Sequence, residues 1–314
     1  MNSLQRRAAF AFCANLALCT AALAALCAGC FQNNFIPADA AHAEAIRVDT
    51  ARVDSVKRWG RVKPFVGDFE SGGLAVWSSH EAARADSIQV VVDPVRRGRH
   101  AAKFTVRPGD RTSNGNRAEL VWDNREQPGS QSWYGWSFLV PSDYADVEPK
   151  PNLWQLMGQW HDQPDPGRGE TWDDFPGHSP PISIVYSAKK GASRIELWYG
   201  TYAAGAIQKI VATAPIQKGR WNDLVFHIGW SPREDGFIEA WLNGKPFIAQ
   251  GDKRHNKQHK VFGANMWNAY PHYLKIGLYR SSLITTTNSV YFDEVKIGNS
   301  YRDVAIAAHA AGSR

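Results

Sequence analysis

Cysteine is almost absent from this sequence. The 314 residues contain four cysteines, all within the first 30 positions, and the last of them is Cys30. The rest of the chain therefore has no disulfide and no thiol nucleophile, which excludes cysteine-based catalysis. We expect packing or a bound metal to stabilise it. Zinc is not indicated, because the sequence has no cluster of histidine and cysteine residues.

Acidic residues are missing from the first 30 positions, where Arg6 and Arg7 precede an apolar run. This pattern predicts an export leader over residues 1–30. Residues 27–30 (CAGC) match a lipoprotein box in which Cys30 would be lipidated, and cleavage within residues 38–43 is the alternative. An uncleaved membrane anchor is a third possibility. We expect an exported protein that is periplasmic, anchored to the outer membrane as a lipoprotein, or secreted.

Long helical periodicity is also lacking beyond residue 60. Short runs rich in Val, Ile, Phe, Tyr and Trp recur instead, separated by Gly, Pro, Asn and Asp. Asn243 and Gly244 between two such runs indicate a tight hairpin. So many strands predict an all-β fold, a two-sheet antiparallel β-sandwich of the jelly-roll type. The predicted strands cover residues 100–107, 117–123, 132–140, 153–161, 182–186, 194–199, 221–230, 237–242, 273–280 and 290–297.

Internal repeats are absent, so the chain is predicted to hold one folded domain. We expect a linker over residues 31–60, the β-sandwich over residues 61–302 and a tail over residues 303–314. Without the two leader arginines, 34 basic residues face 30 acidic ones, a net charge of +4. This mild excess is compatible with a polyanionic ligand but does not require one. We expect a monomer with no nucleic-acid partner.

Polar side chains share one face of the predicted strand over residues 273–280, because side chains alternate along a strand. Tyr273, Lys275 and Tyr279 point to one side, and three aliphatic residues point to the other. Gly277 lies on the polar side, where its lack of a side chain would let a ligand approach closely.

Two other predicted strands also have a polar face and an apolar face. Gln159 and His161 share a face of one, and Arg117 and Glu119 share a face of the other. Each strand alone would be an ordinary amphipathic strand with its polar side in water. Together, however, the strands supply a guanidinium, an amide, an imidazole, an ammonium and a phenol. These groups can hold a carboxylate and move protons beside it.

These strands carry a family resemblance. Residues 117–120 (RAEL), 159–161 (QWH) and 273–279 (YLKIGLY) occur in that order. They resemble the signature strands of the jelly-roll polysaccharide lyases, which include alginate, glucuronan and heparin lyases of that fold. The resemblance implies a concanavalin-like sandwich with a concave substrate groove, and an anionic polysaccharide as the partner.

Two supporting segments, residues 133–138 and 291–295, resemble the glucuronan-lyase-like branch of these enzymes. Trp160 and Arg280 depart from the alginate lyase pattern. These departures favour glucuronan or another glucuronate-containing polymer over alginate.

The resemblance implies β-elimination, in which a uronate loses its C5 proton and its O4 substituent and leaves a 4,5-unsaturated end. Arg117 and Gln159 would stabilise charge on the uronate carboxylate, and Lys275 would add positive charge. Tyr279 would protonate O4. For a glucuronate, in which the C5 proton and O4 lie on the same face, Tyr279 would also take the C5 proton. His161 would take it for the opposite epimer, or would otherwise relay protons or hold the carboxylate. A phenol that acts as a base needs a lowered pKa, which Lys275 or Arg117 would provide.

Substrate binding is predicted for Glu119, Tyr273 and Trp172. Trp172 belongs to a long segment, residues 162–179, which is expected to form a lid or else a plain surface loop. Its indole would stack on a sugar ring.

A metal is predicted only in a structural role. Glu70 and Asp293 resemble carboxylates at the terminal strands of sandwiches that hold a calcium ion, although ordinary edge-strand charge is the alternative. No cofactor is expected to be required for catalysis.

Two other function classes fit a β-sandwich of this kind. One is a non-catalytic carbohydrate-binding module, which would not need Tyr279 together with His161. The other is a glycoside hydrolase, which needs two facing carboxylic acids. Glu119 is the only acid on the three polar strand faces, so the hydrolase is the weaker alternative.

Overall fold

The computed structural model describes residues 59–112, 115–123, 126–202, 209–249, 251 and 259–306. The predicted leader with its lipidation site at Cys30, and the linker up to residue 58, lie outside the described residues. None of the helices within the described ranges has the length and hydrophobicity of a membrane span.

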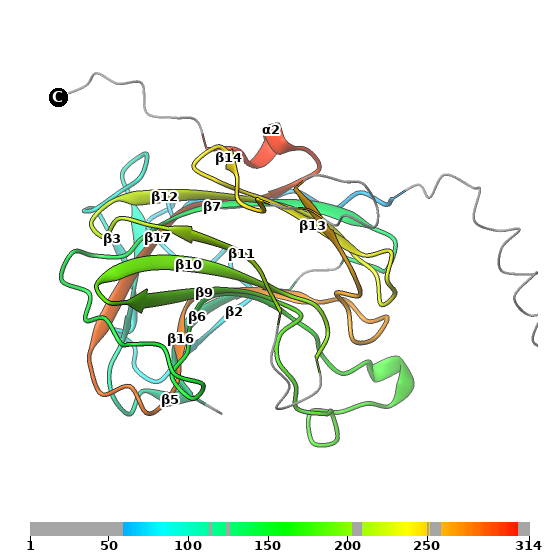
Figure 1. The fold of residues 1–314 in the computed structure, drawn as a ribbon, viewed down its shortest axis with the longest axis horizontal. Helices are drawn as coiled ribbons and strands as arrows, with labels where there is room; N and C mark the ends of the chain where they lie inside the picture. The colour runs from blue at the N-terminus through cyan, green and yellow to red at the C-terminus, as the bar shows by residue number, and fades with distance from the viewer. Residues whose placement is uncertain are drawn as a thin grey trace, which may run out of the picture. The chain divides into compact units, whose positions relative to one another are not determined.

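Two antiparallel sheets form the fold, as Figure 1 shows in two layers. We call them the back sheet and the front sheet. The back sheet runs β14 (Lys245–Pro246), β13 (Phe237–Leu242), β12 (Trp221–Gly229), β7 (Gln131–Leu139), β17 (Asn288–Gly298), β4 (Ala101–Val106) and β3 (Ile88–Val91), with β1 (Phe65–Gly67) on β17 and β15 (Lys260–Phe262) on β13. The front sheet runs β11 (Ile210–Pro215), β10 (Ala192–Tyr199), β9 (Ile182–Lys189), β8 (Gln155–His161), β16 (Tyr273–Arg280), β6 (Gly115–Trp122) and β2 (Ser79–Ala82), with β5 (Arg111–Thr112) on β6. The predicted all-β sandwich is confirmed.

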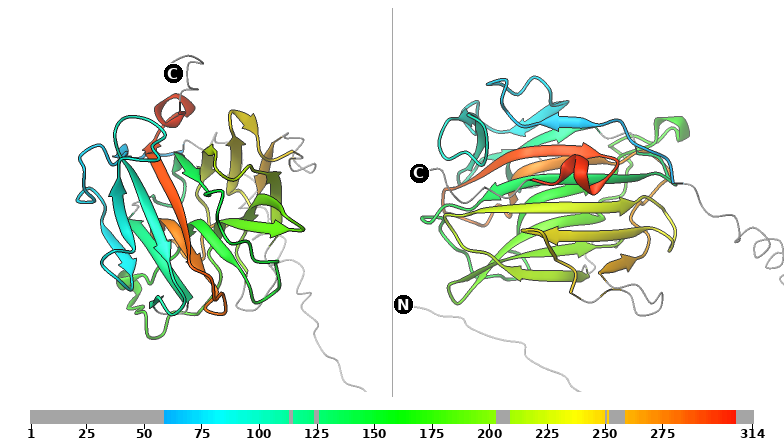
Figure 2. Two further views of the ribbon diagram at one scale, coloured as in Figure 1. Left: turned by 90° about the vertical axis from the view of Figure 1, so that its left-hand side faces the viewer. Right: turned by 90° about the horizontal axis from the view of Figure 1, so that it is seen from above.

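Helical structure is confined to two short elements within the described residues. A single 3-10 turn, η1 (Pro166–Arg168), lies in the long segment between β8 and β9. The helix α2 (Tyr301–Val304) lies on the outer side of the back sheet (Figure 2). It packs so closely that a Cβ atom at Gly135 would stand 2.2 Å from the carbonyl oxygen of Val304.

The core lies between the sheets and is built by the apolar halves of the alternating strands. On β16, Leu274, Ile276 and Leu278 are completely buried. Trp160 on β8 packs against Trp136 on the opposite sheet, with ring centroids 5.5 Å apart. Truncating a buried tryptophan of this kind typically costs ~3–5 kcal/mol. The core contacts hold β8 and β16 rigidly, which fixes the polar side chains on their other face.

Positive φ angles explain the glycines at two positions in the strands and turns. Asn243 and Gly244 both have positive φ, 51° and 75°, so the predicted tight hairpin between β13 and β14 is confirmed. Gly277 has φ of 138° in a bulge of β16 against β8. A Cβ atom there would meet the carbonyl oxygen of Ala118 at 2.2 Å and the ring of Phe104 at 2.9 Å. Gly277 therefore serves the bulge, and our interpretation that it opens space for a ligand was wrong.

Candidate active site

The three predicted signature strands are neighbours in the front sheet, in the order β8, β16, β6. Tyr279 pairs with Arg117, Lys275 with Gln159, and Tyr273 with His161. Because the alternate residues of β16 fill the core, these side chains lie on the outer face of the sheet. The structure thus brings together all the side chains for which sequence predicted a catalytic role.

Glu119 lies on the same face, is buried there by its neighbours, and contacts two of the predicted catalytic residues. Its Oε1 accepts a 2.6 Å hydrogen bond from Nε2 of Gln159, and its Oε2 lies 3.6 Å from Nη1 of Arg117. Burial raises the pKa of Glu119, and the charges of Lys275 and Arg117 offset part of that rise. In this structure the Glu119 carboxylate contacts Gln159 and Arg117. The substrate contact predicted for Glu119 remains a prediction.

Glu81 is a site residue that sequence reasoning missed. It lies on β2, directly opposite Glu119 on β6. One carboxylate oxygen lies 2.5 Å from Nζ of Lys275, and the other binds Nη1 of Arg117. Burial tends to raise the pKa of Glu81, but the two cations outweigh it and lower that pKa. An ionised carboxylate therefore bridges Arg117 and Lys275.

Tyr279 lies at the other end of the cluster, under the guanidinium of Arg117. The guanidinium carbon stands 3.8 Å from the ring centroid, and Trp154 packs edge-on at 4.5 Å. Burial raises the pKa of Tyr279, and the Arg117 charge offsets only part of that rise. The Arg117 charge lowers this pKa as expected, but desolvation outweighs it, so the net pKa is raised. The phenol stays protonated at neutral pH and can donate a proton.

His161 has a carboxylate partner that follows it directly in the chain. Nδ1 of His161 lies 2.9 Å from Oδ1 of Asp162, and the other oxygen of that carboxylate lies 2.9 Å from Nε2 of His178. The hydrogen bonds from both imidazoles outweigh burial and hold the pKa of Asp162 well below its usual range. Neither Asp162 nor His178 is among the residues for which the sequence predicts a role in the site.

The comparisons with known proteins agree with this geometry. A family model described as "Polysaccharide lyase" matches residues 69–296. The chain belongs to the polysaccharide lyase family. The resemblance seen in the three strand motifs is thereby confirmed, and the protein is a lyase.

Solved structures of other lyases share the fold. An endo-β-1,4-glucuronan lyase from the fungus Trichoderma reesei is 21% identical, with 76% of this chain and 97% of that chain covered and a TM-score of 0.56. The alginate lyase Aly36B is 9% identical, with 76% and 98% covered and a TM-score of 0.51. No curated protein matches the sequence. At these identities the structural likeness establishes the fold alone.

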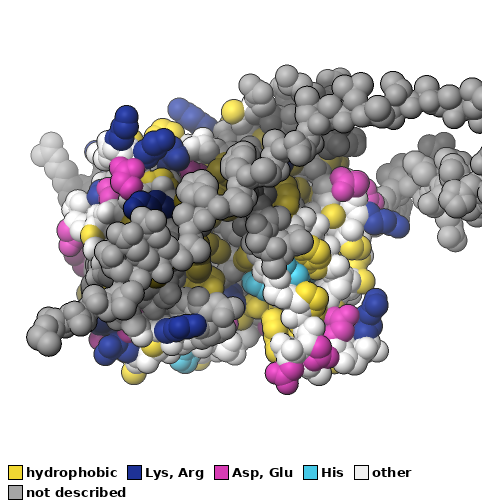
Figure 3. Space-filling model, turned by 60° about the horizontal axis from the view of Figure 1, so that its bottom comes forward, with side chains coloured by type: hydrophobic (Ala, Val, Ile, Leu, Met, Phe, Trp, Pro, Cys, Tyr) yellow, Lys and Arg dark blue, Asp and Glu magenta, His cyan; other side chains and the backbone are white. Residues whose placement is uncertain are grey.

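A cavity of about 410 Å³ opens beside the predicted catalytic residues of this lyase. Trp172, whose side chain is 60% exposed, lines it together with Tyr273 and Glu81. The other lining residues are Ser78, Ser79, Val121, Asp123 and Gln163. Figure 3 turns the outer side of the front sheet forward, where histidine side chains lie beside hydrophobic ones. Trp172 and Tyr273 thus lie where a sugar next to the cluster would bind, and their predicted role in substrate binding stays a prediction.

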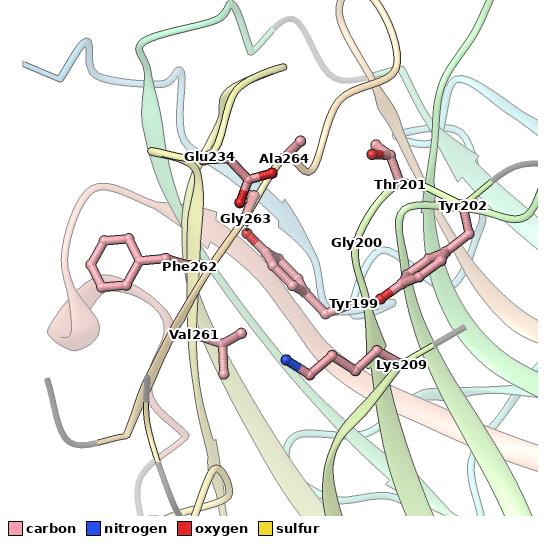
Figure 4. A pocket seen from close by; sticks show the side chains of 10 residues that line it. All are labelled: Tyr199, Gly200, Thr201, Tyr202, Lys209, Glu234, Val261, Phe262, Gly263 and Ala264. Atoms are coloured by element: carbon pink, nitrogen blue, oxygen red, sulfur yellow. Dashed lines mark hydrogen bonds between the residues drawn. The ribbon is translucent and has the colours of Figure 1, made fainter. Parts of the chain in front are cut away.

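A second cavity of the lyase, of about 210 Å³, lies where β10 and β15 end (Figure 4). Lys209, Tyr202 and Glu234 contribute polar groups to it, and the hydroxyl of Tyr199 donates to the carbonyl oxygen of Gly263 at 2.9 Å. None of the predicted site residues lines this cavity, whereas Tyr273 and Trp172, predicted for substrate binding, line the first, so the second cavity is not the candidate active site.

The carboxylates predicted to hold calcium face backbone donors. Oε1 of Glu70 accepts from the N–H groups of Arg99 and His100, both at 2.9 Å. Oδ2 of Asp293 accepts from Arg96 and Arg97, and burial raises the pKa of Asp293 to about 6. Within the described ranges, no three Asp, Glu, His or Cys side chains are grouped to hold a metal. The calcium site stays a prediction, and N–H donors around both carboxylates fit a cation poorly.

Proposed function

We propose that this lyase cleaves a glucuronate-containing acidic polysaccharide by β-elimination and leaves 4,5-unsaturated uronate ends. The observation that carries the proposal is the carboxylate of Glu81 bound between Arg117 and Lys275. These two cations are spaced to bind a carboxylate, and proton-transfer groups lie on either side of them along β16. A uronate is the sugar that presents a carboxylate next to the carbon that loses its proton.

The chemistry follows from where charge develops. The C5 proton of a uronate is poorly acidic, so its removal requires stabilisation of the charge that spreads onto the adjacent carboxylate. Arg117 and Lys275 supply positive charge there, and the N–H of Gln159 that is not donated to Glu119 supplies a hydrogen bond. The protonated phenol of Tyr279 donates to the departing O4.

Glucuronan is the polymer we favour. The support is the similarity of residues 133–138 and 291–295 to the glucuronan-lyase-like branch, and the shared fold with the glucuronan lyase of Trichoderma reesei. Trp160, a departure from the alginate lyase pattern, is buried between the sheets and therefore carries no argument about the substrate.

The test is a panel of polymers with the purified protein. Glucuronan, alginate, heparin-type glycans and hyaluronan are incubated separately, and the unsaturated uronate is followed by its absorbance at about 235 nm, which the elimination must produce. The proposal expects the chromophore to appear fastest with glucuronan. New reducing ends without the chromophore would indicate a hydrolase. Polymer binding without any product would indicate a carbohydrate-binding module.

We also propose that the protein is exported, with Cys30 as the lipid attachment site. The support is the acid-free leader with its CAGC box at residues 27–30. Metabolic labelling with a radioactive fatty acid tests the anchor, and the label should be present in the wild-type protein and absent from Cys30→Ala. Equal labelling of both proteins would reject Cys30 as the site.

A further inference from the structure

The fully buried carboxylate of Asp162 lies between two imidazoles that come from opposite ends of one loop. His161 is the last residue of β8, and His178 stands near the end of the segment that leads into β9. Each imidazole has one ring nitrogen 2.9 Å from a different oxygen of the carboxylate. The Asp162 carboxylate therefore connects the two ends of residues 162–178 through two short His–Asp contacts.

The neighbours of His161 determine which of its ring nitrogens carries the proton. Nδ1 lies 2.8 Å from the backbone carbonyl oxygen of Asp162 and 2.9 Å from its carboxylate. Both neighbours can only accept a hydrogen bond, so Nδ1 must donate. In a neutral imidazole the other nitrogen, Nε2, then holds the lone pair. Nε2 is on the side of the ring away from Asp162, and the side chain is 21% exposed beside Tyr273.

His178 is itself held firmly. Its ring stacks on Trp267, with centroids 4.3 Å apart, and Phe175 packs edge-on at 5.5 Å. Its Nδ1 is buried with no hydrogen-bond partner within the described residues, so its only polar contact there is the one to Asp162. His272 beside this group is buried, which lowers its pKa to about 4 and keeps it uncharged at neutral pH.

We propose that Asp162 and His178 are positioning residues that present Nε2 of His161 as the proton acceptor of the elimination. This inference rests on the proposed function. Because the phenol of Tyr279 stays protonated, Nε2 of His161 takes the C5 proton in its place. The electron pair of the C5–H bond becomes the C4–C5 double bond, and the C4–O4 bond breaks. O4 takes its proton from the phenol of Tyr279. His178 belongs to the same loop as Trp172, which lines the cavity. The contacts of Asp162 with His161 and His178 therefore connect the proton acceptor to this loop.

The first test is Asp162→Asn. Asparagine can present an N–H to Nδ1 and so oppose the tautomer that the backbone carbonyl of residue 162 still favours. In the serine-protease triad, the known example of this exchange, it costs about 10⁴-fold. We expect kcat to fall at least 100-fold with little change in KM, and ¹⁵N NMR to show the proton of His161 moved from Nδ1 to Nε2. In a His161→Ala background the same change should cost nothing further.

The second test covers the case in which Asp162→Asn fails to fold. His178→Phe keeps a ring against Trp267 but removes the donor to Asp162, whereas His178→Gln keeps an N–H donor. We expect kcat to fall in His178→Phe and to be largely rescued in His178→Gln. The matched control is His227→Gln, which removes a His–Glu pair of 2.6 Å on the back sheet and should leave kcat unchanged.

Two results would overturn the inference. One is an unchanged tautomer of His161 in Asp162→Asn, and the other is a loss confined to KM. The tautomer of His161 is measured without substrate, so failure of this inference can be told apart from failure of the proposed function. In that case the wild-type protein would release no unsaturated product from any polymer, while Asp162→Asn would still shift the proton of His161.

Discussion

Nζ of Lys275 lies 2.5 Å from Oε1 of Glu81, while the other oxygen of the same carboxylate binds Arg117. An internal carboxylate thus already holds both cations that we assign to the uronate. The side chain of Glu81 is 34% exposed and lines the cavity next to the cluster. A uronate that enters this place competes with Glu81 for the same two partners.

Removing the charge of Glu81 should therefore strengthen substrate binding. We expect Glu81→Gln to lower KM about 1.5-fold to fivefold, the range expected for one partly exposed ion pair, with a smaller effect on kcat. Steady-state kinetics of the unsaturated product measure both constants. The control is Glu148→Gln, because Glu148 binds the backbone of Lys190 outside the cluster. A higher KM together with a lower kcat would show instead that Glu81 holds the two cations in place.

The phenol of Tyr279 is expected to matter through its proton alone. Tyr279→Phe keeps the ring between Arg117 and Trp154, so the fold should be unaffected. We expect kcat to fall by about 10²–10⁴-fold, the usual contribution of a general acid, and polymer binding to persist. Tyr291→Phe, which removes a hydroxyl beside Lys103 on the back sheet, is the control. Activity within twofold of wild type in Tyr279→Phe would exclude this role.

The exposed indole of Trp172 should act on binding and not on chemistry. Stacking of an aromatic side chain contributes ~0.5–1.5 kcal/mol, so Trp172→Ala should raise KM roughly twofold to tenfold with kcat nearly constant. Val92→Ala, which shortens an exposed apolar side chain away from the cluster, gives the baseline. If KM is the same in both variants, the cavity does not hold a sugar against Trp172.

A buried carboxyl group outside the site should lower the stability of the fold as the pH rises from acidic to neutral. Glu126 accepts a 2.6 Å hydrogen bond from Tyr134, and burial raises its pKa to about 7 from an ordinary value of 4.5. The folded state therefore favours the protonated form, and stability is lost as pH rises from about 4.5 to about 7. The loss is on the order of 3 kcal/mol.

Glu126→Gln stays uncharged at every pH and can still accept the bond from Tyr134. Urea unfolding at pH 5 and pH 8 should show a smaller loss of unfolding free energy in the variant than in the wild-type protein. The variant should be the more stable protein at pH 8. Equal losses in the two proteins would refute the assignment to Glu126.

The central strands of the site could be predicted from sequence because they obey a simple rule. On β16 each polar residue of the outer face alternates with an aliphatic residue of the core, and β6 and β8 share this pattern. The period of two identifies the strand and its faces together. Ordered motifs then indicated that these strands are neighbours, and the register confirmed it.

The missed residues had no such pattern. Glu81 lies on β2, which has four residues (SHEA) and no buried side chain, so its role depends entirely on lateral pairing with β6. Asp162 and His178 are brought together by the course of a loop, which no periodicity encodes. Gly277 was misinterpreted because alternation does not reveal the bulge that requires its positive φ.

Cleavage in water enriched in heavy oxygen tests the central claim most directly. Elimination adds no water to the two fragments, whereas hydrolysis adds one oxygen atom from the solvent. Mass spectrometry of oligosaccharides released from glucuronan should show fragments without heavy oxygen, one of them carrying the unsaturated uronate. Heavy oxygen incorporated at the cleavage point would contradict β-elimination by this site.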